Sequence, residues 1–202
     1  MIGADIPDVV LHTRVRDEDI APNPFRWAPI RAPELMGHGR VAVFLFPAAF
    51  SPTCSDSHLP GIEKRHARFE DAGCRAVFGL AVNDAFTMHR WGEQLGIEKV
   101  QLLPDGNGDF ARRLGMLVSR RHLGYGFRAW RSAFVAEDGK IVAWFQEPGI
   151  QDDGGTDDDP YGETAPERVL DWLESRARGT AGASRAEPPD RRSGRSAAAV
   201  DA

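Results

Sequence analysis

The residue of this chain best suited to chemistry is Cys54, which follows a polar turn after an apolar segment. Residues 41–46 (VAVFLF) are rich in β-branched and aromatic side chains, a pattern that predicts a strand buried on both faces. Pro47 ends this strand because proline cannot donate to a sheet ladder. Thr53 or Ser55 is suited to cap a helix that begins near Cys54. The first turn of a helix favours a thiolate, so this placement predicts a reactive thiol.

A buried structural thiol is the alternative, because a free cysteine often behaves as a small hydrophobic residue. The residues around Cys54, at 51–56, are otherwise polar or turn-forming, which favours a functional site near the surface. Cys74 is the opposite case, since it follows Gly73 at the entry to an apolar segment. We therefore predict a functional Cys54 and a structural Cys74.

Three classes of reaction are candidates for Cys54, and the sequence excludes one of them. Disulfide exchange within one motif requires Cys-x-x-Cys, and Ser57 at the second position excludes it here. A cysteine protease requires a supporting histidine, and His58, His66 and His89 leave that reaction open. A thiolate that attacks a small electrophile such as a peroxide requires less, namely a cation and hydroxyl groups that position the oxygens.

Composition narrows the class of protein. The 202 residues are 42% hydrophobic, enough for a core, and the net charge is −5 with interspersed signs, which argues against a nucleic-acid-binding surface. No segment has the length of a membrane span. The first residues (MIGADIPDVV) show neither a basic region nor an apolar core, so we expect no secretory signal. Two cysteines are consistent with a reducing compartment, and we expect the protein to be cytoplasmic.

The elements that position Cys54 alternate between strands and helices and end in a hairpin and a helix, which predicts an α/β protein with a thioredoxin-like fold. A central mixed β-sheet is expected to be flanked by helices. The predicted strands are 8–12, 41–46, 75–82, 100–103, 132–136 and 141–145; the predicted helices are 32–36, 54–72, 85–95, 110–114 and 166–175. Segment 13–33 is predicted to be irregular and 119–130 to be a basic connector.

The chain is predicted to form one domain, residues 1–178, followed by a disordered tail, residues 179–202. The tail consists largely of Ala, Gly, Ser, Pro and Arg and lacks the apolar surface that would offset its ordering entropy. Residues 151–159 are acidic, but their spacing does not match a calcium loop, so we predict a solvated loop. The histidines show no ligand spacing. We expect neither a metal nor a bound cofactor.

The sequence around Cys54 carries a family resemblance. Pro47-x-x-x-Ser51-x-x-Cys54 resembles the Pro-x-x-x-Thr/Ser-x-x-Cys signature of peroxiredoxins. The wider strings PAAFSPTCSDSHLPG, LAVNDAF, PDGNGDF and LGYGFRAWRSAFVAEDG are similar to the type-five (atypical redoxin) branch, above all its bacterial glutaredoxin-coupled members. This resemblance runs from about residue 3 to residue 175. It implies a thiol-dependent peroxidase that reduces hydrogen peroxide and organic hydroperoxides.

The resemblance also implies residue roles. Cys54 would be the peroxidatic cysteine, which a peroxide oxidises to a sulfenic acid. Ser51 stands where most members have threonine, and its hydroxyl would bond the thiolate and the peroxide. Pro47 would shield the thiolate from water. Arg131 matches the active-site arginine, whose fixed cation would favour the thiolate and polarise the peroxide.

His58 and Arg128 match positions that the family keeps close to the site, so supporting roles are implied for both. Where this branch has a resolving cysteine, it lies in the loop after the hairpin, and 151–159 contains none. A one-cysteine cycle resolved by an external thiol follows, with glutathione and glutaredoxin as the implied partners.

Two other functions remain compatible with the sequence. A redox sensor or holdase would use Cys54 oxidation as a switch and need not turn over. In a non-catalytic thioredoxin-fold binding module, the rate of Cys54 alkylation would depend on pH as for a free thiol, with a midpoint at about pH 8.5.

Type-five relatives commonly pair through the edge that carries the active-site loops, and we expect a symmetric homodimer here. Pro52, Phe86, Trp91 and segment 123–127 supply apolar groups on segments that flank Cys54. The alternative is that Phe86 and Trp91 fill the core beneath their helix.

Overall fold

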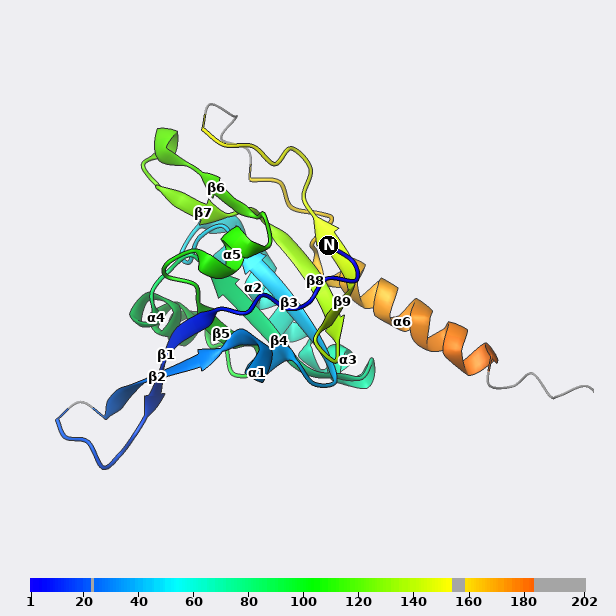
Figure 1. Cartoon of the computed structure of the whole chain (residues 1–202), viewed down its shortest axis with the longest axis horizontal. Coiled ribbons are helices and arrows are strands. Elements are labelled where there is room, and N and C mark those ends of the chain that lie inside the picture. Colours follow the sequence, from blue (N-terminus) through cyan, green and yellow to red (C-terminus); the bar gives the residue numbers. More distant parts are fainter. Residues whose placement is uncertain (23, 154–158, 184–202) are drawn as a thin grey trace, which may run out of the picture.

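The computed structural model describes residues 1–22, 24–153 and 159–183, and its centre is a mixed five-stranded sheet (Figure 1). The strands are β3 (Arg40–Phe46), β4 (Cys74–Ala81), β5 (Gln101–Pro104), β8 (Ser132–Glu137) and β9 (Lys140–Gln146). Their spatial order is β5-β4-β3-β8-β9. β3, β4 and β5 run parallel to one another. β8 runs antiparallel to both of its neighbours, β3 and β9. The predicted α/β thioredoxin-like fold with a central mixed sheet is therefore confirmed.

β3 lies in the middle of this sheet and is buried on both faces, as predicted for 41–46. Alternate side chains enter two separate cores because successive residues of a strand point to opposite faces. Val43 belongs to the core that contains Phe110 and Phe134. Phe44 and Phe46 belong to the core beneath the helices on the other face, and Cys54 lies in that second core. The strand thus anchors the segment that carries Cys54.

The predicted helix 54–72 is a chain of three elements: the π-helix η1 (Thr53–His58), α2 (Leu59–Lys64) and α3 (His66–Asp71). The π-turn is closed by the Leu59 N–H, which donates to the Cys54 carbonyl. The predicted cap by Thr53 or Ser55 is wrong, because no side chain caps η1, whose N-cap is Pro52. The Ser55 hydroxyl instead accepts a hydrogen bond from Trp91 Nε1 at 3.0 Å.

Local signals predicted several other elements correctly. α4 (Ala85–Leu95) begins at Asp84, whose carboxylate accepts two backbone N–H bonds, and ends at Gly96 in the left-handed region. α1 (Ala32–Met36) and α5 (Asp109–Arg113) lie within one residue of their predicted positions. The turn between β8 and β9 uses Asp138 and Gly139, both with positive φ, as expected of an Asp-Gly hairpin.

Two predicted irregular segments contain hairpins instead. β1 (Val10–Arg16) and β2 (Phe25–Arg31) pair within 8–33, so the prediction of an irregular 13–33 is wrong. Pro29 is tolerated in β2 because a two-stranded sheet has edges on which no N–H need be donated. The predicted connector 119–130 forms most of a second hairpin, in which β6 (Leu117–Ser119) and β7 (Phe127–Ala129) pair across the 3₁₀ turn η2 (Arg121–Leu123). Figure 1 shows both hairpins projecting from the central sheet.

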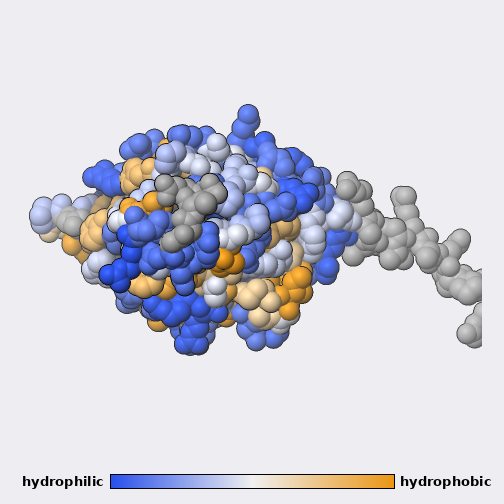
Figure 2. Space-filling model, turned by 90° about the horizontal axis from the view of Figure 1, so that it is seen from above, coloured by the Kyte–Doolittle hydropathy of each residue, from blue (hydrophilic) through white to orange (hydrophobic). Residues whose placement is uncertain are grey.

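α6 (Pro166–Ala183) begins where predicted but runs past 175. Residues 179–183, which we assigned to a disordered tail, belong to this helix in the structure, so that part of the prediction is wrong. Residues 184–202 lie outside the described part, so the rest of that prediction is untested. Within the described part, no helix is long and apolar enough to cross a bilayer. In the view from above, apolar groups form separate patches on a largely hydrophilic face (Figure 2).

Candidate active site

Cys54 and Arg131 meet in the interior, although 77 positions separate them in the chain. Arg131 lies directly before β8, whose first residue Ser132 pairs with Leu45 near the end of β3. The end of β3 also delivers the turn that leads to Cys54, so the sheet register brings the two residues together. Arg131 Nη1 lies 3.4 Å from Cys54 Sγ. Both side chains are buried, and a guanidinium at this distance stabilises a thiolate.

His58 contacts the same guanidinium. Its Nδ1 lies 3.0 Å from Arg131 Nη1, and its Nε2 lies 3.0 Å from the Thr164 carbonyl oxygen. A carbonyl oxygen can only accept a hydrogen bond, and a guanidinium can only donate one. Nε2 of His58 therefore carries the proton, and Nδ1 accepts from Arg131. Burial, together with the charge of Arg131, holds the pKa of His58 well below its usual range against the opposing bond to Thr164. His58 is therefore a neutral acceptor that orients Arg131.

The carbonyl that fixes His58 is itself held by a buried carboxylate. Glu147 Oε1 accepts bonds from the Thr164 N–H at 2.8 Å, the Thr164 hydroxyl at 2.7 Å and the Gly162 N–H at 2.9 Å. Burial opposes the charge of Glu147, but these donors outweigh it and lower its pKa. A chain of contacts thus runs from Glu147 through Thr164 and His58 to Arg131.

Arg131 forms an ion pair with the carboxylate of Asp159, which is exposed to solvent. Asp159 Oδ1 lies 2.5 Å from Arg131 Nη2, and the Tyr161 ring lies 5.6 Å from the guanidinium carbon. Burial disfavours the charge of Arg131, yet attraction from Cys54 and Asp159 raises its pKa overall. The cation is therefore permanently charged, and two acidic groups compete for its donors.

The described residues of segment 151–159 are exposed, as predicted for a solvated loop, but Asp159 also pairs with Arg131. At the other end of that segment, Asp152 accepts the Ser119 N–H at 2.7 Å and Asp153 accepts the Arg121 N–H at 2.6 Å. The described acidic residues therefore bind the fold rather than water alone. Residues 154–158 lie outside the described part.

Ser51 and Pro47 lie on the turn between β3 and η1. The Ser51 hydroxyl donates to the Ala48 carbonyl at 2.9 Å, so its proton is directed to the backbone in this conformation. The Ser51 carbonyl accepts the Ser55 N–H at 2.9 Å, which closes the turn. Pro47 forms part of the wall of a cavity next to this turn. Their bonding and shielding roles stay predictions.

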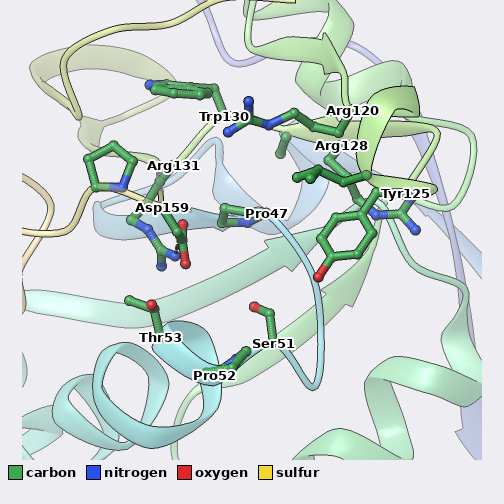
Figure 3. Close-up of a pocket in the computed structure, with 13 residues that line it drawn as sticks. Pro47, Ser51, Pro52, Thr53, Arg120, Tyr125, Arg128, Trp130, Arg131 and Asp159 are labelled. Atoms are coloured by element: carbon green, nitrogen blue, oxygen red, sulfur yellow. Dashed lines mark hydrogen bonds and ion pairs between the residues drawn. The ribbon is translucent and has the colours of Figure 1, made fainter. Parts of the chain in front are cut away.

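The cavity has a volume of about 230 Å³ and is shown in Figure 3, where Arg131 and Asp159 face Pro47 across it. Cys54 is not part of its wall and is fully buried. The sulfur is therefore shielded from bulk solvent in this conformation. Thirteen residues line the cavity: Pro47, Ser51, Pro52, Thr53, Arg120, Leu123, Tyr125, Arg128, Ala129, Trp130, Arg131, Asp159 and Pro160.

Arg128, to which the resemblance gave a supporting role, lines the cavity but contacts neither Cys54 nor Arg131 by any hydrogen bond in the described part of the chain. Cys74 is a buried thiol at the start of β4, and burial raises its pKa to about 11, as expected of a structural residue. No group of three acidic, histidine or cysteine side chains among the described residues is arranged to hold a metal ion.

Sequence reasoning missed three members of the site: Asp159, Thr164 and Glu147. No spacing pattern marks them, because their contacts join segments 15 to 106 residues apart. It also left Trp91 undecided, and the structure settles it: Trp91 is fully buried in the core, whereas Phe86 is half exposed. Trp91 is therefore not part of an exposed apolar surface.

Three comparisons with known proteins find similarity to related proteins. A family model described as Redoxin matches residues 32–161. Peroxiredoxin y4vD of Sinorhizobium fredii is 45% identical over 169 residues, which are 83% of this chain and 89% of that protein. Hybrid peroxiredoxin hyPrx5 of Haemophilus influenzae is 36% identical over 73% of this chain and 58% of its own length. A Plasmodium falciparum antioxidant protein, described as a 1-Cys peroxiredoxin, matches with a TM-score of 0.77 at 26% identity, covering 87% of this chain and 99% of that one.

Proposed function

The chain belongs to the redoxin family as a peroxiredoxin of the type-five-like branch, and we propose that Cys54 alone carries its thiol peroxidase activity, with glutathione and glutaredoxin as reductants. The observation that supports the assignment of the site is the contact between the Arg131 guanidinium and the Cys54 sulfur inside the core. A permanently charged partner at this position can stabilise the negative charge that the reaction places on and around the sulfur.

In the first step, the Cys54 thiolate attacks one oxygen of the peroxide in line with the O–O bond. That bond breaks, a sulfur–oxygen bond forms, and the second oxygen leaves as an alcohol or water after it takes up a proton. The cationic Arg131 stabilises the charge that develops on the departing oxygen, and Ser51 supplies a hydroxyl at the same turn. Since Cys54 is buried, a peroxide reaches it only with a local displacement of the cavity wall.

The second step is the return of the sulfenic acid to the thiol. Cys74 is an unsuitable partner because it starts β4 opposite Arg40, the first residue of β3, whereas Cys54 follows the far end of β3. A seven-residue strand spans roughly 20 Å, far beyond the roughly 7 Å Cα separation that a disulfide tolerates. An external thiol must therefore resolve Cys54. The description of the similar Plasmodium protein as a 1-Cys enzyme supports this cycle.

A homodimer is part of the same proposal. Phe50, Phe86, Tyr125 and Phe127 are all at least two-fifths exposed, and Tyr125 lines the cavity beside Cys54. Exposed aromatic groups near a site are typical of a protein interface. A contact there would cover the mouth of the cavity and help to exclude water.

The test is steady-state peroxide consumption with glutathione and glutaredoxin as reductants. We expect Cys54→Ser to abolish turnover and Cys74→Ser, the matched control, to retain it. Undiminished turnover in Cys54→Ser would sink the assignment. Loss of turnover in a folded Cys74→Ser protein would contradict the one-cysteine cycle. Oxidation of Cys54 without any recycling would instead favour the redox sensor or holdase.

A further inference from the structure

Arg128 lies in the wall of the cavity beside Cys54, and no carboxylate of the described residues pairs with it. It extends from β7, and its Nη1 donates to the neighbouring Phe127 carbonyl at 2.7 Å. Its Nε is buried and has no hydrogen-bond partner. No acidic side chain of the described residues forms an ion pair with it, and the Tyr125 ring lies 5.9 Å from its guanidinium carbon. The Nε donor of this cavity-lining cation is therefore unsatisfied in the structure.

Asp159 is the carboxylate among the described residues that line the cavity with Arg128. It is already bound to Arg131. Partial burial of Arg128 lowers its pKa, because desolvation of a cation without an anion is unfavourable. An anionic ligand would relieve that cost.

The remaining walls fit a small organic molecule rather than an inorganic anion. Leu123, Tyr125, Trp130 and three prolines give the cavity apolar surface. Figure 3 shows Arg128 behind the Tyr125 ring, on the opposite side of Pro47 from Arg131. A guanidinium binds a carboxylate through two parallel hydrogen bonds. A ligand anchored at Arg128 would therefore lie along the cavity toward the Cys54 turn.

We propose that Arg128 binds the carboxylate of the thiol that reduces oxidised Cys54, so that a small anionic thiol is the preferred reductant. The proposal rests on the one-cysteine cycle above. The thiol sulfur attacks the sulfenic sulfur, a mixed disulfide forms, and the hydroxyl leaves as water with a proton. A second thiol then attacks the ligand sulfur of the mixed disulfide, which releases the Cys54 thiolate and a disulfide of the two small thiols.

The experiment compares 3-mercaptopropionate with 2-mercaptoethanol, which differ in the carboxylate. The full-length protein is oxidised with one equivalent of hydrogen peroxide, and the rate of mixed-disulfide formation is followed by mass spectrometry. We expect Arg128→Gln to reduce the rate ratio of the two thiols by about tenfold or more, the value of a charge-assisted hydrogen bond. Arg112→Gln is the matched control, because Arg112 is exposed on α5, pairs with Asp109 and lies outside the cavity; it should preserve the ratio.

An unchanged ratio in Arg128→Gln would overturn the proposal, and so would an equal fall in Arg112→Gln. A carboxylate could also come from the oxidant, so a fatty-acid hydroperoxide is compared with its methyl ester in the oxidation step. A charge preference confined to that step would overturn the assignment to the reductant. If peroxide does not oxidise Cys54 in the unmodified protein, the peroxidase cycle itself fails, which is a separate result.

Discussion

Replacement of His58 by glutamine tests whether this histidine is neutral in the folded protein. His58 is buried between the Phe44, Phe46 and Tyr161 rings, and its pKa is well below the ordinary value of 6.5. Glutamine does not titrate, but it carries an amide donor for the Thr164 carbonyl and an oxygen acceptor for Arg131. The variant therefore removes the titration and keeps the polar contacts.

The sign of the effect follows from where the proton binds. Below about pH 6.5 the unfolded chain protonates His58 while the folded chain does not, so acid favours the unfolded state. The loss amounts to about 1.4 kcal/mol per pH unit once the pH is well below 6.5, and to about 2 kcal/mol between pH 7 and pH 5. Above pH 7 the two states bind the same number of protons at this residue, and the contribution is constant.

The assay is urea unfolding of both proteins at several pH values from 7 to 5. Other groups titrate in both proteins, so the difference in unfolding free energy isolates His58 and should shift by about 2 kcal/mol in favour of the glutamine variant at pH 5. If the unfolding free energies of the two proteins changed equally with pH, the buried neutral histidine would be refuted. His58→Phe is the control: it also removes the titration, but it leaves Arg131 without its acceptor, so only this variant should react more slowly with peroxide.

Three further outcomes are expected. Glu147→Ala should lower the unfolding free energy by about 2–4 kcal/mol in urea unfolding, because three donors lose their acceptor; an unchanged midpoint would contradict the buried contact. In Cys54→Ser, the remaining Cys74, with a pKa of about 11, should be ionised in about one molecule per thousand at pH 8; rapid iodoacetamide labelling of the native protein, seen by mass spectrometry, would refute its structural role. Phe86→Asp should convert a dimer of the 22.2 kDa chain to a monomer in light scattering; a retained dimer would exclude Phe86 from the interface.

The parts of the fold that the sequence predicts are those with local signals. β3 is marked by an unbroken apolar run, and α4 by the Asp84 cap and Gly96. The β1–β2 hairpin was missed because Pro22, Pro24 and Pro29 suggested irregular backbone, although an edge strand tolerates proline. Trp91 was ambiguous since helical periodicity gives a face but not whether a neighbouring chain or the core covers it.

The same difference between local and long-range signals decides which site residues the sequence predicts. Cys54, Ser51 and Pro47 share one turn, so a short motif contains them. Arg131 was found only through the resemblance, because its proximity depends on the register of β8 against β3. Asp159 had no such support: its position depends on the path of the loop after β9, which residue types alone do not determine.

Oxidation of Cys54 changes the charge balance that Arg131 experiences. With the thiolate present, the guanidinium faces two anions, the sulfur at 3.4 Å and Asp159 at 2.5 Å, and a neutral His58. A neutral sulfenic acid removes one of these anions, while the charge of Arg131 persists. The cavity is then more positive than in the reduced protein, and Arg128 adds to that potential. An entering carboxylate is consequently bound most favourably after the peroxide has reacted, which is the state in which a reducing thiol is required.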